Sequence, residues 1–369
     1  MKRKIYLITI FKTNNIGAIL QAFALHSQLA EYGNVSLVDI DNKHIDKGIK
    51  LIRTGATFKS ILSSGKDVLR LKSRRKVISK FKLFLNRFKT ITLEDLTQVS
   101  NEDVYYFTGS DQIWNPNCIS SNKKIDERYF FKNIVSNNIN AYASSKGSYD
   151  YSDNEQEVFF KLLSNFKNIS VRESDFSKYL IQNGFPETKH VLDPSLLLNK
   201  NEWLDLNFSL SLSISKRLPE KFILVYTIPR TKILNDLILI IKKTLNLPIV
   251  IIDQNFTTFR YADIQLKDAG PEDFINLVNS SEFIITDSFH GTCFAINFNK
   301  NFITADIGHL SNRVKSLLKL VKLEDRLVDK KSITKFQKKE NLNIDFSTIN
   351  KIIEMERLRC KKYINDCFK

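Results

Sequence analysis

The chain has few cysteines, and they are not arranged for covalent or metal cross-linking. They form no CxxC pair and no cluster with histidine; the four are Cys118, Cys293, Cys360 and Cys367. Such scattered positions argue against a disulfide framework and against a zinc site. A reducing cytoplasm suits this cysteine usage, and we expect the protein to bind no metal.

Long apolar runs and an export signal are also missing. No stretch approaches the roughly 20 apolar residues needed to span a bilayer. Basic residues at positions 2–4 precede an apolar run at 5–11, as in a signal peptide, but Lys12 and Asn14 interrupt the run and no small-residue cleavage site follows. We therefore expect residues 4–11 to form a first strand. We also expect the protein to be cytoplasmic, either soluble or peripheral at the inner face of the membrane.

Glycine and proline are scarce as well, with 11 and 7 residues in a chain of 369, which argues against low complexity. The hydrophobic content of 43% is ample for a core, and the length suggests two domains. The formal net charge is +16. This charge points to a polyanionic neighbour, such as nucleic acid, an anionic membrane or phosphorylated small molecules.

The basic residues are densest between positions 66 and 89. Apolar residues are interleaved with them at roughly helical intervals, which predicts a basic amphipathic helix. Such a helix can lie on an anionic membrane surface; the alternative is a helix packed on the core with a solvated outer face. We expect no nucleic-acid partner, because no recognised binding module accompanies the charge. The apolar residues are Leu69, Val77, Phe81, Phe84, Leu85 and Phe88, and the basic ones are Lys66, Arg70, Lys72, Arg74, Arg75, Lys76, Lys80, Lys82, Arg87 and Lys89.

Hydrophobic periodicity predicts an α/β fold. Strand 4–11, helix 18–30 and strand 35–40 form a βαβ unit, whose parallel sheet has loop 13–17 at its ligand-binding edge. That loop lacks GxGxxG, so it is no dinucleotide fingerprint. Further strands are expected at 103–108, 129–131, 139–144 and 169–171. The second half repeats the alternation, with strands at 222–227, 248–252, 282–286 and 301–305 and helices at 231–245, 271–279 and 312–321.

Two consecutive α/β halves suggest two Rossmann-like domains that face a cleft. We expect an N-terminal domain at residues 1–198, a polar, serine-rich linker at 199–219 and a C-terminal domain at 220–345. The last segment, 346–369, is expected to form a helix that packs back on the N-terminal domain.

Polar residues follow two of the predicted strands in the first half. In the first loop, Asn14, Asn15 and Gly17 suit binding of a polar, uncharged group such as a sugar. The second loop carries small and polar residues at 109–112 beside Trp114. An exposed tryptophan there suits carbohydrate binding by stacking and hydrogen bonding. The alternative is a turn in which Trp114 is buried.

Arg172 directly follows the predicted strand 169–171 and begins a helix. A guanidinium at such a junction can hold an anion through two hydrogen bonds. It can equally pair with Glu173 or Asp175 on the surface.

The stretch 286–292 links an apolar strand to a helix. His290 thus stands at the strand's C-terminal tip, beside a helix N-terminus, where free backbone N–H groups and the helix dipole favour anions. Because the intrinsic pKa of histidine lies near neutrality, His290 can transfer protons beside a bound phosphate or carboxylate. The alternative is a histidine that fills a turn by hydrogen bonding.

Together these features resemble the polysaccharide pyruvyl transferase family. Each motif is weak alone, but the set runs in the family's order from about residue 5 to about residue 326, nearly the whole chain. The matching stretches are 15–25, 109–115, 169–173, 192–194, 288–292, 311–318 and 323–326. The chain departs from the family in two places. It has Ser145-Lys146-Gly147 where Ser-Phe-Gly is frequent, and Ser288 where some branches carry an arginine.

The resemblance implies a fold like the two-domain GT-B glycosyltransferases. It also implies transfer of pyruvate from phosphoenolpyruvate to a sugar, as a cyclic ketal on two hydroxyls. The implied acceptor is a sugar of a bacterial surface polysaccharide, such as an exopolysaccharide or capsule, or of its lipid-linked precursor. Phosphoenolpyruvate is the donor substrate, and no cofactor is expected. Assembly on a lipid carrier would account for the basic segment 66–89 without nucleic acid.

The implied reaction assigns roles to the residues. It protonates the methylene carbon of phosphoenolpyruvate, adds a hydroxyl at the central carbon and expels phosphate, which calls for an acid, a base and stabilisation of the phosphate. We expect His290 to act in acid–base catalysis and Asp111 to act as a base for a sugar hydroxyl. The expected donor-binding residues are Arg172, Ser288, Gly291, Thr292, Asn312 and Arg313; the expected acceptor-binding residues are Asn14, Asn15, Gly17, Gln21, Ser110, Gln112 and Trp114.

Two other functions fit the same sequence. A GT-B glycosyltransferase would use a nucleotide sugar and release a nucleoside diphosphate in place of phosphate. A non-catalytic glycan-binding protein would bind the acceptor without turnover.

Overall fold

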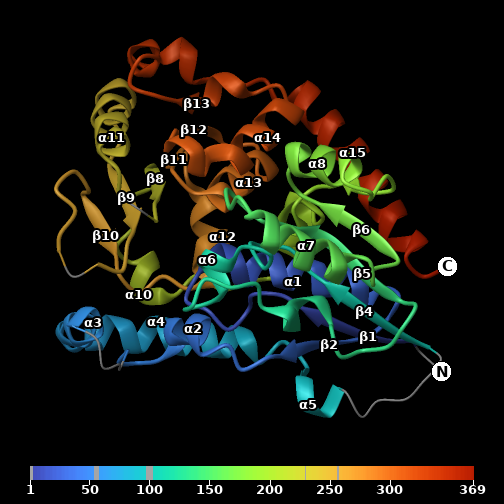
Figure 1. The fold of residues 1–369 in the computed structure, drawn as a ribbon. Coiled ribbons are helices and arrows are strands. Elements are labelled where there is room, and N and C mark those ends of the chain that lie inside the picture. The colour runs from blue at the N-terminus through green and yellow to red at the C-terminus, as the bar shows by residue number, and fades with distance from the viewer. Residues whose placement is uncertain (1–2, 54–57, 97–102, 229, 256) are drawn as a thin grey trace. The chain divides into compact units, whose positions relative to one another are not determined.

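Two parallel β-sheets, each flanked by helices, make up the protein (Figure 1). The computed structural model describes residues 3–53, 58–96, 103–228, 230–255 and 257–369, and the side chains of 58–63 lie outside this description. The chain divides into two units. The first comprises residues 1–47, 85–198 and 353–369, and the second comprises 48–84 and 199–352. Each unit is described by itself.

The first sheet has seven strands in the order β3-β2-β1-β4-β5-β6-β7, and every pair is parallel. The order reverses between β1 and β4, and in open α/β sheets ligands bind beyond the carboxyl ends of the strands at such a switch point. The strands are β1 (Arg3–Ile8), β2 (Gly33–Asp39), β3 (Thr90–Thr92), β4 (Val104–Thr108), β5 (Ile139–Ser144), β6 (Asn168–Val171) and β7 (Lys189–His190).

The helices of the first unit bury apolar faces against this sheet. Helix α1 (Ile16–Ala30) is apolar along most of its length, and nearly all of it is buried. A large aromatic cluster packs together in the core, including Trp114, Tyr129, Phe130 and Phe159. The remaining helices are α2 (Lys43–Asp46), α5 (Leu93–Leu96), α6 (Pro116–Ile119), α7 (Asp153–Leu163) and α8 (Ser174–Gln182), with short 3₁₀ turns η2 (Glu127–Phe130) and η3 (Pro194–Leu196).

The C-terminal helix, α15 (Phe346–Asp366), belongs to the first unit from Ile353 onward. Arg357 Nε donates to the carbonyl of Leu196 at 2.7 Å, and the Tyr363 hydroxyl donates to the carbonyl of Ala141 at 2.9 Å. Beyond the helix, the ring of Phe368 stacks on Tyr32 with centroids 4.6 Å apart. The prediction that the C-terminal helix packs back on the N-terminal domain is confirmed.

The second sheet has six parallel strands in the order β10-β9-β8-β11-β12-β13, with its own switch point between β8 and β11. The strands are β8 (Ile223–Tyr226), β9 (Ile249–Ile252), β10 (Ile264–Leu266), β11 (Phe283–Thr286), β12 (Asn301–Ala305) and β13 (Leu327–Val328). The helices that follow them are α11 (Lys232–Leu245), α12 (Pro271–Ser280), α13 (Phe289–Asn297) and α14 (Asn312–Leu320). The predicted linker 199–219 contains α9 (Lys200–Asp205) and α10 (Leu212–Ser215) and groups with this unit.

Two basic helices, α3 (Phe58–Leu69) and α4 (Leu71–Leu85), also group with the second unit, except for the last residue of α4. Lys80 Nζ donates to Asp273 Oδ2 at 2.7 Å, at the start of α12, and the ring of Phe84 lies 5.7 Å from that of Phe208. Residues 48–84, which the expected boundary at 198 assigns to the N-terminal domain, thus belong with the second unit here. Within the described residues, no helix combines the length and apolar character of a membrane-spanning segment.

Candidate active site

His290 lies at the switch point of the second sheet. It is the second residue of α13, directly beyond the carboxyl end of β11, and it is 5% exposed. Ser288 caps the helix, and its hydroxyl accepts a hydrogen bond of 3.4 Å from the amide of Gly291. His290 therefore stands in the first helical turn, where backbone N–H groups and the helix dipole favour an anionic ligand.

Glycine at position 291 lets this helix approach the sheet closely. A Cβ at Gly291 would lie 2.3 Å from the Thr286 hydroxyl oxygen and 3.1 Å from Cδ1 of Tyr226. Thr286 itself is fixed, because its hydroxyl donates to the Tyr226 carbonyl at 2.6 Å and accepts from the Ser288 amide at 3.0 Å. The residue after His290 thus sets how near the helix start lies to β8 and β11.

Asp287 joins the two loops of this switch point. Its carboxylate accepts hydrogen bonds from the Thr227 hydroxyl at 2.8 Å and from the Ile228 amide at 3.0 Å, both in the loop after β8. Burial raises the pKa of the Asp287 carboxyl, and these hydrogen bonds offset part of that rise. The aspartate before the helix cap therefore holds the loops together.

Helix α14 brings a cation close to the histidine. The guanidinium of Arg313 lies over the ring of Phe289, with Cζ 5.5 Å from the ring centroid, and Phe289 is the neighbour of His290. Asn312, the first residue of α14, is exposed. Arg313 and Asn312 therefore belong to the same unit as His290, and Arg313 contacts the residue beside it.

Thr292 is engaged in the fold. Its hydroxyl contacts the Ser288 carbonyl at 3.0 Å and the Thr304 hydroxyl at 2.8 Å, and its side chain is fully buried. It thus ties the start of α13 to β12. This geometry favours a positioning role over direct contact with a donor.

Arg230 is a second cation at this switch point, and sequence reasoning missed it. It follows β8, its amide donates to the Thr227 hydroxyl at 3.2 Å, and its Nε donates to Asp253 Oδ2 at 2.6 Å. Its Nη1 also donates to the Thr257 hydroxyl at 3.0 Å. The signal that drew attention to Arg172, a basic residue just past a predicted strand, applies equally to Arg230 after strand 222–227.

In the first unit, four of the expected acceptor-binding residues lie in the loop after β1 and in the first two turns of α1. Asn15 caps α1, with Oδ1 accepting from the Ala18 amide at 3.2 Å, and Gly17 is buried within the first turn. Asn14 is half-buried in the loop. Gln21 is fully buried, and its amide donates to the Thr9 hydroxyl at 3.0 Å. Asn14 thus lies at the loop's surface, whereas Gln21 supports the loop from within.

Arg172 is enclosed by carboxylates. Its side chain is 1% exposed, and its guanidinium nitrogens lie 2.9 Å from Asp193, 3.4 Å from Asp111 and 3.5 Å from Glu173. Burial lowers the pKa of this guanidinium, but the carboxylates, Asp193 foremost, raise it above its ordinary value. Pairing with Glu173 was the alternative to anion binding; the structure shows that pairing, together with two partners distant in sequence.

Residues of the loop after β4 take part in the same network of Arg172 and its carboxylate partners. Ser110 donates to Asp193 Oδ2 at 3.0 Å, and Asp111 has a left-handed backbone with φ of 72°. Asp111 Oδ1 accepts from the Gln112 amide at 2.8 Å, and the Gln112 side chain accepts from Asn115 at 2.9 Å. Because β1 and β4 flank the switch point of the first sheet, Asn14, Ser110, Asp111 and Gln112 gather at one edge of this unit.

Trp114 does not form the expected exposed stacking surface. It is 1% exposed, its ring stacks on Phe130 with centroids 5.6 Å apart, and its centroid lies 5.5 Å from that of Phe159. The aromatic core fills both sides of the indole, so Trp114 has no face available to a sugar. The prediction that Trp114 stacks on the acceptor sugar is therefore wrong, because Trp114 is part of the aromatic core.

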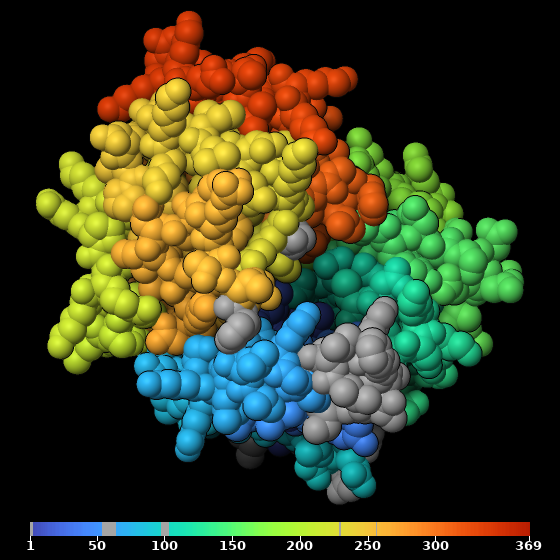
Figure 2. All heavy atoms as spheres, turned by 90° about the vertical axis from the view of Figure 1, so that its left-hand side faces the viewer, coloured from blue at the N-terminus to red at the C-terminus, as the bar shows by residue number. Residues whose placement is uncertain are grey.

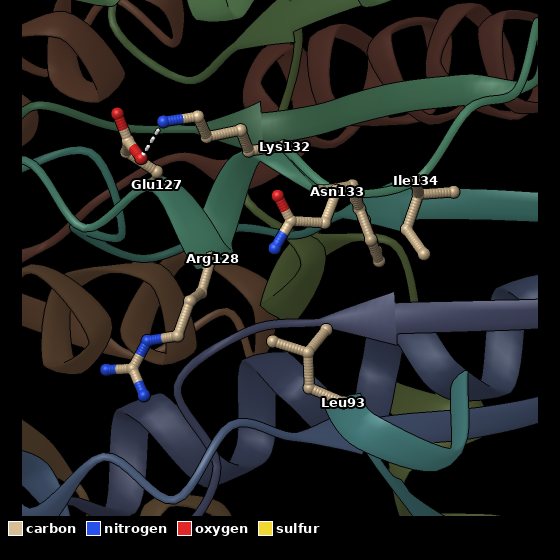
Figure 3. A pocket seen from close by; sticks show the side chains of 7 residues that line it. Leu93, Glu127, Arg128, Lys132, Asn133 and Ile134 are labelled. Atoms are coloured by element: carbon tan, nitrogen blue, oxygen red, sulfur yellow. Dashed lines mark hydrogen bonds and ion pairs between the residues drawn. The ribbon is translucent and has the colours of Figure 1, made fainter. Parts of the chain in front are cut away.

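A surface pocket of about 280 Å³ lies elsewhere in the first unit, beside α5 and η2 (Figure 3). None of the residues expected from sequence lines it. Its cations are already paired, Lys132 with Glu127, and Arg128 with Asp126 at 2.7 Å. The lining residues are Leu93, Glu127, Arg128, Phe131, Lys132, Asn133 and Ile134. In the described part of the chain, no group of three or more His, Cys, Asp or Glu side chains is placed to hold a metal ion.

Comparison with solved structures defines the class of fold. The UDP-GlcNAc 2-epimerase of Methanocaldococcus jannaschii is 10% identical, with 96% of this chain and 99% of that chain covered and a TM-score of 0.50. Arabidopsis thaliana UGT89C1, complexed with quercetin, is 9% identical, with 100% and 99% covered and a TM-score of 0.50. At such identities the likeness shows the fold alone. The protein has a GT-B-like α/β fold with two Rossmann-like sheets, as predicted.

The family follows from a sequence model. The model of polysaccharide pyruvyl transferase matches residues 15–309, which is most of the chain. The chain therefore belongs to the polysaccharide pyruvyl transferase family. Membership of this family makes it a transferase that acts in the pyruvylation of polysaccharides. A search of curated proteins finds no significant match.

Proposed function

We propose that this protein transfers pyruvate from phosphoenolpyruvate to two hydroxyls of one sugar, forming a ketal on a bacterial surface polysaccharide or its lipid-linked precursor. The observation that carries the proposal is the position of His290, in the first turn of α13 at the switch point of the second sheet. A proton donor and an anion-favouring helix start are then combined at one place. The reaction needs both, because the donor is an anion and its methylene carbon must be protonated.

On this proposal the second unit binds the donor. The N-terminal amides of α13 and the guanidinium of Arg313 interact with the phosphate or carboxylate of phosphoenolpyruvate. Arg230, in the loop after β8, adds positive charge to the donor-binding unit, although its pairing with Asp253 neutralises part of that charge. Ser288 and Gly291 contribute by shaping the helix start.

The chemistry divides into two steps. His290 gives a proton to the methylene carbon, which becomes a methyl group, while a sugar hydroxyl adds to the central carbon and loses its proton to a base. The bond from the central carbon to the phosphate oxygen then breaks, and phosphate leaves with the bonding electron pair. The second hydroxyl then adds to the same carbon and gives its proton to His290, which is neutral after the first proton transfer; this closes the ketal and restores the acid. Cationic and N–H groups stabilise the departing phosphate.

The first unit binds the acceptor on this proposal. Asn14, Ser110, Asp111 and Gln112 gather at the edge where β1 and β4 end, and their amide, hydroxyl and carboxylate groups suit sugar hydroxyls. Asp111 acts as the base. Its strained, left-handed backbone is compatible with a side chain held in place for a function.

The test is direct. The protein is incubated with phosphoenolpyruvate and a panel of synthetic or lipid-linked glycosides, and phosphate release and the acceptor mass are followed together. Phosphate released in step with a pyruvate-ketal mass increment supports the proposal. Release of a nucleoside diphosphate from a nucleotide sugar, with glycosylation of the same acceptors, would instead establish a glycosyltransferase. Acceptor binding with no turnover of either donor would establish a glycan-binding protein.

A further inference from the structure

Positive charge is concentrated in one short segment of the chain. Residues 47–89 contain fourteen lysines and arginines and a single acidic residue, Asp67. This segment therefore carries a formal charge of +13 of the chain's +16. An electrostatic partner of the protein is thus expected to meet this segment first.

The apolar face of α4 is buried. Val77, Phe81 and Phe84 are all buried, and Phe84 packs on Phe208 of the same unit, so this apolar stripe is not available to a membrane. The cations on the opposite face recur at helical spacing and are exposed; they are Lys72, Arg75, Lys76 and Lys82. For this part of α4, the packed-helix interpretation is the one observed.

Other apolar side chains of the same region are exposed around the junction of α3 and α4. Val68 and Leu69 end α3 and are 55% and 64% exposed, and Leu71 begins α4 and is 39% exposed. Leu51 and Ile52, both 38% exposed, lie in the preceding turn. These five residues, with the exposed Lys66, Lys72 and Arg75, are termed the junction surface. Exposed aliphatic side chains gathered among cations mark an interaction site rather than an ordinary solvated face.

A buried ionic network braces this surface. Asp67 is fully buried and accepts hydrogen bonds from Arg53 at 2.9 Å and from Arg70 at 2.8 Å. Arg74 Nε donates to the Leu51 carbonyl at 2.8 Å, which ties the turn to α4. Arg70 also donates to the carbonyl of Gln254 at 2.9 Å, within the same unit. The apolar side chains are therefore displayed on a backbone fixed at several points.

We propose that the junction surface docks on an anionic lipid bilayer. Its aliphatic side chains enter the interface between head groups and acyl chains, and Lys66, Lys72 and Arg75 meet the lipid phosphates. A nucleic acid or a soluble polyanion would match the charge but leaves the aliphatic side chains without a partner. The α3–α4 segment, light blue in Figure 2, lies open to solvent on this face of its unit.

The test measures binding to vesicles by flotation. Wild-type protein is mixed with vesicles of phosphatidylcholine alone or with one third phosphatidylglycerol, at low and high salt. We expect binding to the anionic vesicles, weakened by salt. Lys72→Glu/Arg75→Glu is expected to lower the affinity at least tenfold, since each cation near an anionic surface contributes about fivefold. The matched charge control, Lys330→Glu/Lys339→Glu, changes two exposed lysines elsewhere in the same unit and is expected to bind like wild type.

The apolar contribution is tested separately. Val68→Ser/Leu69→Ser is expected to lower vesicle affinity about tenfold or more without changing binding to heparin. Leu358→Ser is the matched control, because Leu358 is 61% exposed on α15. Loss of vesicle binding in the charge variant but not in the Ser variant would show attraction by charge alone, without insertion of the aliphatic side chains, and would overturn the proposal, as would absence of wild-type binding. This surface and its readout are independent of pyruvyl transfer, and all these variants should keep wild-type activity on a short, water-soluble acceptor.

Discussion

The carboxylate of Asp287 accepts a hydrogen bond of 2.8 Å from the hydroxyl of Thr227, and this bond joins the loops after β8 and β11. Burial raises the pKa of Asp287 above its ordinary value. A carboxyl whose folded pKa exceeds its unfolded pKa stabilises the fold fully below the unfolded pKa. That contribution is lost as the pH rises through the folded pKa.

The first prediction concerns the pH dependence of this aspartate. Asp287→Asn removes the titrating carboxyl, so wild type is expected to lose stability relative to the variant as the pH rises above about 4, the ordinary pKa of aspartate. Urea unfolding of both proteins at several pH values measures the difference. A constant difference across these pH values would contradict the prediction.

The second prediction concerns His290. His290→Asn keeps a polar side chain but cannot serve as a proton donor near neutrality, so kcat for transfer is expected to fall about 10²- to 10⁴-fold. Melting temperature and acceptor binding are expected to stay near wild type. His44→Asn is the control, since His44 is exposed and belongs to the other unit. A variant that melts far below wild type would instead assign His290 a structural role.

The third prediction concerns Gly291. Gly291→Ala places a methyl group 2.3 Å from the Thr286 hydroxyl oxygen, and overpacking of this kind costs about 1–3 kcal/mol of unfolding free energy. Because the helix start must shift, transfer activity is expected to fall as well. In Gly65→Ala the new methyl meets no atom within 4 Å, and the same change in a helix is expected to stabilise by about 0.5–1 kcal/mol. Equal effects of the two substitutions on unfolding would argue against close packing at Gly291.

The fourth prediction concerns Arg172. Arg172→Gln removes the guanidinium that pairs with the buried Asp193, and breaking a buried ion pair from one side costs about 3–5 kcal/mol. The KM for phosphoenolpyruvate, measured on the folded fraction, is expected to stay unchanged. Arg128→Gln disrupts an exposed pair with Asp126 and is expected to cost less than about 1 kcal/mol. A stable Arg172→Gln protein with a raised KM would restore the anion-binding role.

The fifth prediction concerns Asp67. Burial raises the pKa of its carboxyl, but hydrogen bonds from Arg53 and Arg70 outweigh this and hold the pKa at about 2. The stabilisation is therefore complete above the unfolded pKa, near 3.8, and is lost as the pH falls towards 2. Asp67→Asn is expected to cost about 3–5 kcal/mol at pH 7 and less in acid. Glu187→Gln, at an exposed pair with Lys189, should be nearly neutral, and acid titration of unfolding compares the two.

The alternation of strands and helices was predictable because buried parallel strands carry continuous apolar runs that local sequence displays. The placement of His290 at a strand tip followed from the same signal. The apolar run 129–131 was predicted to form a strand, and this prediction is wrong. Its first two residues end a 3₁₀ turn, and the third, Phe131, has a left-handed backbone with φ of 52°. Apolar character alone does not distinguish a strand from a buried turn.

Side-chain roles depended on partners far away in sequence. Trp114 is buried by Phe130 and Phe159, and Arg172 is paired with Asp111 and Asp193, none of which is a local neighbour. The grouping of residues 48–84 with the second unit relies on contacts such as that of Lys80 with Asp273. Periodicity and motif spacing carry no information on such pairings, so these assignments required the structure.

The division of the chain into units has a consequence for its biosynthesis. The chain passes from one unit to the other after residues 47, 84, 198 and 352, so neither unit is a continuous stretch. The second unit lacks part of its sequence until residue 352 has been made, and the first awaits the final helix that covers Ala141 and Leu196. Domains of many proteins fold in turn as they leave the ribosome. Here neither unit is complete before residue 352 has been made, and nascent chains stalled before this residue should remain sensitive to protease in both units.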